Sequence, residues 1–471
     1  MSNKSPFHAD IMSLHQEVTG SCTLVTVRFP NEGKIKFIVD CGMFQEQIYE
    51  ERNSVIPFDV DDIEFCMTTH VHVDHIGRLP LLVRKGFFNP IYATTDTCNL
   101  LPHALADSCR IINSDAKSKK ISALYQEDDV ECTLKLLRPC EYDKTVQVHK
   151  NIRTTFFRNA HIPGAALILI QISYPEHKDI NLLFTGDYNE NNMFLEKSIL
   201  PEWVLELPIT IIQESTYGDM DSTEIHKCFN ENVVSCLNEN GTVIIPVFSL
   251  GRSQEILYIL KKMQVEGEIS IDVPIYFDGK LAFTYTKMFE TGKIGIRPEI
   301  MDFFPENMFY VSKDLRKVLL NSEEEKIIVS TSGMGSYGPV QLYIQKYLPR
   351  QNALIHFTGY VSEGTLGRKL ADASSGTIVS VGGLLAAKRA KVCYTTEFSA
   401  HAKSDEMIKF LKQFKNLKLV LINHGATETK EIFAKRVIEQ ISPKDVGMLG
   451  EEYFFRVDPY GLVKTAPTVF K

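Results

Sequence analysis

The feature that most constrains this chain is the segment 68–77, which reads TTHVHVDHIG and holds His70, His72, Asp74 and His75. An apolar, strand-like run precedes the segment and a helix-like run, 79–85, follows it. Side chains at such a turn leave a sheet at one edge, where they can converge. Zinc accepts imidazole and carboxylate ligands, whereas buried histidines in a chance polar loop would each need a separate partner. The segment therefore predicts a metal site.

Composition limits the class of protein. A chain of 471 residues is too long for one simple core and predicts two or three domains. The net charge of −8 argues against a generally basic nucleic-acid-binding surface but allows a local basic groove. The ten cysteines form no C-x-x-C pair, which fits a reducing compartment. With no signal peptide or membrane span visible, we expect a cytoplasmic protein that does not bind membranes.

The rhythm of apolar runs divides the chain into three regions. The first alternates short strands with turns and includes one long helical stretch, about 97–126. The middle region alternates near-continuous apolar strands with amphipathic helices, which predicts buried parallel strands covered by helices. Its expected strands are 241–248, 274–277, 326–330, 353–357 and 377–381. The last region returns to the first style, with a helix at 404–414, a strand at 417–423 and a helix at 428–440.

Three further residues stand where apolar runs stop, namely His161, Asp187 and His424. Taken singly, each is more simply a turn residue. Together with the segment 68–77 they give five histidines and two aspartates, which is more than one zinc ion needs. Two metals roughly 3.5–4 Å apart that share a carboxylate can activate water and stabilise a leaving oxygen. This chemistry suits the hydrolysis of phosphoesters.

The order of these residues resembles the metallo-β-lactamase fold. In addition, residues 38–42, which read IVDCG, are similar to the first motif of that fold, whose aspartate, here Asp40, supports the metal ligands from behind. The resemblance implies one zinc ion held by His70, His72 and His161. It implies a second zinc ion held by Asp74, His75 and His424, with Asp187 bridging the two.

Later motifs resemble the β-CASP branch of this fold. They are its acidic motif at 213–219, its histidine motif at 397–401 and its last histidine motif at 423–425. Members of the branch are nucleic-acid hydrolases, among them RNase J, the endonuclease of the pre-mRNA 3′-end cleavage complex and smaller prokaryotic ribonucleases. The resemblance implies an α/β protein, an αββα metallo-β-lactamase sandwich of residues 1–208 and 391–471. An α/β β-CASP domain, residues 209–390, would be inserted in it, with the active site in the cleft between the two.

The β-CASP resemblance also implies catalytic roles for Glu214 and His401 beside the bridging Asp187. His401 would protonate the leaving oxygen, and Glu214 would orient His401 and raise its basicity. The alternative for His401 is a capping residue before the helix 404–414. Many members carry an aspartate two residues after this histidine, whereas this chain has Lys403.

Six residues of the middle region are candidates for substrate binding. Backbone N–H groups after a strand can bind phosphate, and basic side chains can contact a nucleic-acid backbone. The alternatives are an ordinary turn and a solvated surface. The candidates are Ser332, Gly333, Arg252, Arg368, Lys388 and Arg389.

The sequence thus predicts a ribonuclease that uses two Zn²⁺ ions to hydrolyse phosphodiester bonds of single-stranded RNA. A single-stranded DNA nuclease of the same family is the first alternative. A small-molecule hydrolase with this core fold and a non-catalytic RNA-binding subunit are the others. Substrate choice is expected to depend on partners or on a homodimer. The sequence specifies neither an endonuclease nor an exonuclease.

Overall fold

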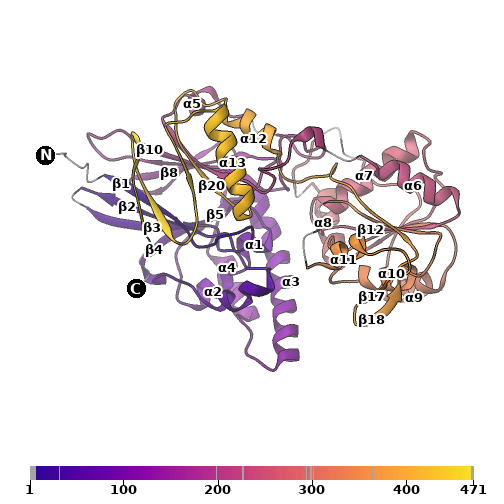
Figure 1. The fold of residues 1–471 in the computed structure, drawn as a ribbon. Coiled ribbons are helices and arrows are strands. Elements are labelled where there is room, and N and C mark those ends of the chain that lie inside the picture. Colours follow the sequence, from indigo (N-terminus) through magenta and orange to yellow (C-terminus); the bar gives the residue numbers. More distant parts are fainter. Residues whose placement is uncertain are drawn as a thin grey trace. The chain divides into compact units, whose positions relative to one another are not determined.

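The computed structural model describes residues 7–30, 32–197, 199–224, 227–292, 294–297, 300, 302–359, 361 and 364–467. Its contacts divide the chain into two units, Met1–Ser222 with Ala400–Lys471, and Thr223–Ser399. Figure 1 shows indigo and yellow segments, from the two ends of the sequence, in the same unit. The second unit is therefore an insertion in the first.

The first unit contains an eight-stranded sheet with the order β23-β22-β1-β2-β3-β4-β5-β6. Pairing is antiparallel from β23 to β3 and parallel from β3 to β6. Its strands are β1 (His8–Ser13), β2 (Thr23–Phe29), β3 (Gly33–Val39), β4 (Ile63–Met67), β5 (Ile91–Thr94), β6 (Leu137–Cys140), β22 (Tyr453–Asp458) and β23 (Gly461–Pro467).

A seven-stranded sheet of the same unit has the order β21-β20-β11-β10-β9-β8-β7. Its strands are β7 (Thr145–His149), β8 (Ile152–Arg158), β9 (Ala166–Ile172), β10 (Ile180–Phe184), β11 (Ile209–Glu214), β20 (Leu417–Asn423) and β21 (Asp445–Met448). The strand β11 runs parallel between β10 and β20. The predicted insert begins at residue 209 and would therefore include this strand. The pairing of β11 with β10 and β20 instead places it in the first unit. The apolar run itself fits a parallel strand of either unit, so only the pairing distinguishes them.

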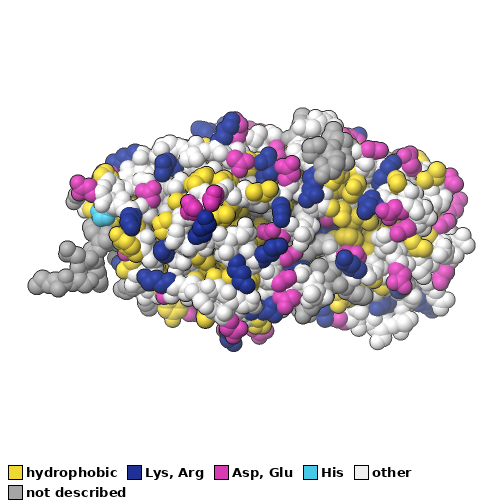
Figure 2. All heavy atoms as spheres, turned by 90° about the horizontal axis from the view of Figure 1, so that it is seen from above, with side chains coloured by type: hydrophobic (Ala, Val, Ile, Leu, Met, Phe, Trp, Pro, Cys, Tyr) yellow, Lys and Arg dark blue, Asp and Glu magenta, His cyan; other side chains and the backbone are white. Residues whose placement is uncertain are grey.

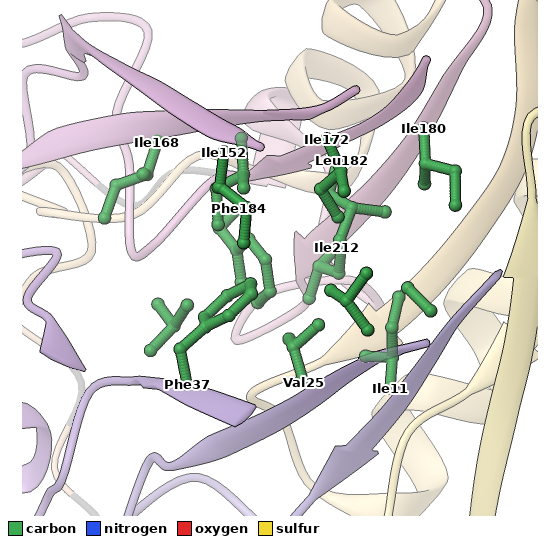
Figure 3. Close-up of a cluster of buried hydrophobic side chains, with 14 of the residues drawn as sticks. Ile11, Val25, Phe37, Ile152, Ile168, Ile172, Ile180, Leu182, Phe184 and Ile212 are labelled. Atoms are coloured by element: carbon green, nitrogen blue, oxygen red, sulfur yellow. The ribbon is translucent and has the colours of Figure 1, made fainter. Parts of the chain in front are cut away.

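The two sheets pack face to face around an apolar core. Ile11, Val25 and Phe37 of the first sheet lie opposite side chains of the second, such as Leu182 and Phe184 (Figure 3). These side chains alternate along their strands with residues that face away, as two layers of sheet require. The predicted αββα sandwich is confirmed.

Helices cover the outer faces of both sheets. Beside the first sheet, they are α1 (Val73–Ile76), α2 (Leu79–Arg84), α3 (Thr95–Lys119) and α4 (Glu127–Lys135). On the second sheet, α5 (Glu202–Leu205), α12 (Ser404–Leu411) and α13 (Thr427–Gln440) pack against the outward side chains of β9 to β11 and β20. The 3₁₀ helices of the unit are Gln47–Ser54, Val60–Asp62 and one that begins at its last residue, Ser222–Glu224. The helical stretch expected at about 97–126 ends early, because Lys120 is left-handed (φ 56°) and ends α3.

The second unit is built on a six-stranded parallel sheet with the order β14-β13-β15-β12-β16-β19. The strands are β12 (Thr242–Pro246), β13 (Ile275–Asp278), β14 (Met308–Tyr310), β15 (Lys326–Ser330), β16 (Ala353–Phe357) and β19 (Lys391–Tyr394). The helices are α6 (Phe229–Asn238), α7 (Arg252–Val265), α8 (Lys280–Glu290), α9 (Lys313–Asn321), α10 (Val340–Tyr347) and α11 (Leu366–Asp372). This arrangement confirms the predicted α/β insert.

One strand of the insert differs from the prediction. The run 377–381 is expected in the parallel sheet, but β17 (Ile378–Val381) pairs antiparallel with β18 (Leu384–Ala387) in a separate two-stranded sheet. Its apolar residues made the run look buried, yet Ile378 is 66% exposed. None of the described helices in either unit is long and apolar enough to cross a membrane.

Candidate metal centre

Candidate ligands lie where strands of the first unit end. The segment with His70 follows β4, Asp187 follows β10 and His424 follows β20. Backbone hydrogen bonds hold these ends together, because Ser215 N–H donates to His424 O (3.0 Å) and Ala166 N–H donates to Thr69 O (3.0 Å). The strands β10, β11 and β20 are neighbours in one sheet, so residues far apart in sequence reach one point.

The first group of candidate ligands comprises His70, His72, His161 and Asp187. His72 Nδ1 lies 3.1 Å from both His70 Nε2 and His161 Nε2. Asp187 Oδ2 lies 3.6 Å from His70 Nε2 and 3.8 Å from His161 Nε2. Three imidazole nitrogens that converge this closely, beside a carboxylate, are the donor set of a tetrahedral zinc site.

The second group comprises Asp74, His75, Asp187 and His424. His75 Nε2 lies 3.1 Å from His424 Nε2 and 3.3 Å from Asp187 Oδ2. Asp74 Oδ2 lies 3.8 Å from the Nε2 atoms of both histidines. Asp187 belongs to both groups, and the candidate ligand atoms within each group lie within 4.8 Å of one another.

Asp40 positions the second group through hydrogen bonds to His75 and to the neighbouring Thr69. Its buried carboxylate accepts hydrogen bonds from Thr69 N–H, Thr69 Oγ1 and His75 Nδ1, each at 2.8 Å. A carboxylate can only accept, so His75 Nδ1 must carry a proton. In neutral imidazole this leaves the Nε2 lone pair free to bind a cation, which is the arrangement of metal-binding histidines.

Electrostatics prepare the first group, with its Asp187, for a cation. Burial lowers the pKa values of His70, His72 and His161, which keeps their nitrogen lone pairs available. Burial opposes ionisation of Asp187, but the nearby His424 and His75 outweigh it and hold the pKa of this carboxyl well below its usual range. Within the described residues, Asp187 Oδ1 is buried and has no hydrogen-bond partner. A buried carboxylate oxygen without a donor fits a metal ion as its missing partner.

Beside the two groups, Glu214 and His401 form a pair. His401 Nδ1 lies 3.2 Å from Glu214 Oε1 and 3.1 Å from Oε2. The Glu214 carboxylate also accepts from Tyr188 N–H (2.8 Å), which fixes its orientation. Burial lowers the pKa of His401, but the charge of Glu214 outweighs burial and raises it overall. His401 is not the N-cap residue of α12, as the alternative interpretation required, because Lys403 occupies that position.

The substrate-binding candidates all lie in the second unit, and most have partners there. Arg252 is buried, donates to Thr358 O (2.6 Å) and pairs with Glu255, whereas Arg389 is exposed. Arg368 pairs with Asp372 (2.8 Å), Lys388 donates to Ala373 O, and the N–H group of Ser332 donates to Tyr337 O. Gly333 is buried beside Ser332. The part of these six residues in binding substrate stays a prediction.

Two contributions to the site were missed from the sequence. Thr69 bonds to Asp40, and its hydroxyl also lies 3.1 Å from His70 Nδ1; its position directly before His70 was a usable signal. The Lys403 ammonium lies 3.5 Å from the ring centroid of Tyr217, whose ring is 5.9 Å from that of His401. No local pattern predicts this second contact, because its partners lie 186 positions apart in the chain.

Comparisons with known proteins agree with this geometry. The metallo-beta-lactamase superfamily matches residues 16–199, the Beta-Casp domain matches 253–370, and the Zn-dependent metallo-hydrolase RNA specificity domain matches 386–446. The chain is 29% identical over 434 residues to an RNase J-like protein of Methanocaldococcus jannaschii, covering 90% of this chain and 93% of that protein. It is 29% identical to Ribonuclease TTHA0252 of Thermus thermophilus, covering 88% and 92%. It is 30% identical to Transcription termination factor FttA of Methanococcus maripaludis, covering 83% of this chain and 63% of that protein.

Proposed function

The chain belongs to the β-CASP ribonuclease family of the metallo-β-lactamase superfamily and is a metal-dependent hydrolase, and we propose that it cleaves RNA phosphodiester bonds with two zinc ions. The observation that carries the proposal is the shared carboxylate of Asp187, which belongs to both groups of candidate ligands. A carboxylate that lies beside two sets of histidines can bind two neighbouring metal ions at once. The number of ions is part of the proposal.

The proposed ligands are those of the two groups. His70, His72 and His161 would hold one zinc ion, and Asp74, His75 and His424 the other, with Asp187 between them. Zinc bound there supplies an activated water and neutralises charge on the phosphoryl oxygens.

The remaining catalytic step falls to Glu214 and His401. Glu214 accepts a hydrogen bond from Nδ1 of His401 and so favours the protonated ring. His401 can then give a proton to the departing sugar oxygen, which is the role of a general acid. The ring of His401 lies 4.8 Å from that of His161, between centroids, so the proton donor is next to the proposed metal ligands.

Single-stranded RNA is the proposed substrate. The family match at residues 386–446 supports RNA, because that domain is described as an RNA specificity domain. Acidic and basic side chains are interspersed over the face shown in Figure 2, so contact with RNA has to come from local groups rather than from overall charge.

The test uses one RNA, labelled at either end, and a DNA strand of the same sequence. We expect RNA to be cut with Zn²⁺ and spared with EDTA, and the two labels show whether cutting is internal or begins at an end. The double variant Asp74→Ala with His75→Ala should abolish cleavage and lower the zinc content. A matched variant with His103→Ala and Asp107→Ala, on the surface of α3, should do neither.

Each other result has a defined meaning. Cleavage retained by the Asp74 and His75 double variant would refute the assignment of the metal ligands. RNA that is bound but uncut, with both metals in place, would indicate a binding subunit. Equal cutting of DNA would favour the single-stranded DNA nuclease.

A further inference from the structure

Two exposed aromatic side chains lie at the carboxyl edge of the parallel sheet in the second unit. Phe248, which follows β12, is 47% exposed, and Tyr337, which follows β15, is 77% exposed. The two strands are neighbours in the sheet. A single exposed aromatic side chain is common on protein surfaces, but ligands of open α/β sheets bind at this edge, where these two side chains occur on neighbouring strands.

Both the backbone and one ring face of Phe248 are in contact with neighbouring groups. Its carbonyl oxygen accepts hydrogen bonds from the N–H and the hydroxyl of Ser253, at the start of α7. A Cβ atom at Gly333 would lie 2.8–3.0 Å from three consecutive ring carbons of Phe248. Near-equal distances to three adjacent carbons place Gly333 over one face of the ring rather than at its edge. Only glycine leaves room for this contact, and the ring remains nearly half exposed.

Tyr337 belongs to the same loop as Gly333. Its carbonyl oxygen accepts from the N–H group and the hydroxyl of Ser332, both at 3.3 Å. A Cβ atom at Gly338 would lie 2.7 Å from Thr331 O, so the loop folds tightly back on itself. Ser332 and Gly333 therefore stand between the backbone of Tyr337 and the ring of Phe248.

A positive charge follows the next strand of the sheet. Lys280 is exposed and begins α8 directly after β13, which neighbours β15. The glycine before it approaches Thr331, where a Cβ atom would lie 2.8 Å from the threonine side chain. Three adjacent strands, β13, β15 and β12, are thus followed by a cation, a glycine-containing loop and an aromatic ring.

We propose that Phe248 and Tyr337 form a stacking platform for bases of single-stranded RNA, flanking a loop that contacts the backbone. This inference rests on the proposed function, because it assigns these side chains to the same substrate. Aromatic faces bind bases of any sequence, and basic or amide groups beside them bind phosphate. The platform accounts for two exposed rings on one sheet edge and for a glycine beneath one of them.

The test measures binding of a short RNA that contains 2-aminopurine, whose fluorescence falls when the base stacks on an aromatic ring. The full-length chain carries His401→Ala so that cleavage is slow during the measurement. We expect Phe248→Leu to weaken RNA binding about 5- to 150-fold, the range for loss of one stacked base. The same variant should lose the fluorescence quenching, Phe248→Tyr should restore both, and Tyr337→Leu should act in the same direction.

Matched controls separate stacking from a damaged fold. Phe309→Leu removes an aromatic residue that is 45% exposed in the same unit, and it should leave RNA binding unchanged. An oligonucleotide with abasic sugars in place of the bases should bind Phe248→Leu and the parent equally. An equal loss with the abasic strand, or unchanged quenching in Phe248→Leu, would overturn the platform alone. A parent chain that binds neither RNA nor DNA strands would overturn the proposed function as well.

Discussion

Replacing Asp40 with asparagine tests whether this residue prepares His75 for zinc. Asp40 has a left-handed backbone (φ 64°), which asparagine adopts readily, so the substitution keeps the fold of the turn. The two side chains also have the same shape. The substitution removes the negative charge and replaces one acceptor oxygen with an NH₂ donor.

The hydrogen bonds of Asp40 allow the magnitude to be worked out. One oxygen accepts from Thr69 N–H, and the other accepts from Thr69 Oγ1 and His75 Nδ1. In either orientation, the amide NH₂ group of asparagine faces at least one of these donors. A buried donor left without an acceptor costs about 1–3 kcal/mol. If the NH₂ group faces His75, the ring must move its proton to Nε2, which removes the lone pair that would bind the metal.

We therefore expect Asp40→Asn to weaken zinc binding by about 10- to 100-fold, the usual effect of losing a partner behind a ligand. Zinc content is measured by mass spectrometry after dialysis against buffers of fixed free zinc, together with RNA cleavage. Asp143→Asn is the control, because Asp143 is exposed and also has a left-handed backbone (φ 63°). Unchanged zinc affinity in Asp40→Asn would refute the reasoning.

Three further changes test other parts of the structure. His401→Ala should lower turnover by about 10²- to 10⁴-fold with zinc retained, and loss of zinc would mean that His401 is a ligand. In the variant Gly42→Ala, the new Cβ atom would lie 1.5 Å from the carbonyl oxygen of Asp74. We therefore expect the free energy of unfolding in urea to fall by about 3 kcal/mol or more and the zinc content to fall as well. An unfolding curve like that of the parent would contradict this contact. Burial lowers the pKa of Lys326 to about 8. The charged ammonium therefore destabilises the folded state fully below pH 8, and this destabilisation disappears as the pH rises toward the ordinary pKa of about 10.4. Stability should thus rise by about 1–2 kcal/mol from pH 8 to 10, after allowance for partial solvent screening, and Lys326→Met should remove that rise; an identical pH profile in the variant would exclude this residue as the cause.

Local patterns predicted much of the fold. The strands β15, β16 and β20 have the bounds that the sequence predicts, because each run is mostly apolar and has polar residues on both sides. The family resemblance supplied the order of the layers, which no periodicity contains. Strands whose identity depends on a distant partner were missed, as with β22, which pairs with β1 across most of the chain length.

In the candidate site, too, some features followed from the sequence and others depended on contacts between distant segments. The sequence predicted that His161, Asp187 and His424 lie with the segment 68–77, and the structure brings them together. Their roles as ligands stay a prediction, as do the cytoplasmic location and the homodimer. The contact of Lys403 with Tyr217 was beyond reach, because a buried ammonium over a ring depends on how α12 meets the turn after β11. The sequence does not show which side chains are exposed at the surface, so it did not indicate Phe248 as a candidate for substrate binding.

The position of the insert in the first unit has a consequence for synthesis of the protein. A nascent chain that has reached Ser399 already carries six of the seven proposed ligands but lacks His424, and its seven-stranded sheet lacks β20. The whole insert must be translated before that histidine emerges, and domains generally fold as units in order of synthesis. Until His424 has been translated, the growing polypeptide therefore lacks one of the seven proposed ligands and cannot complete the proposed metal centre.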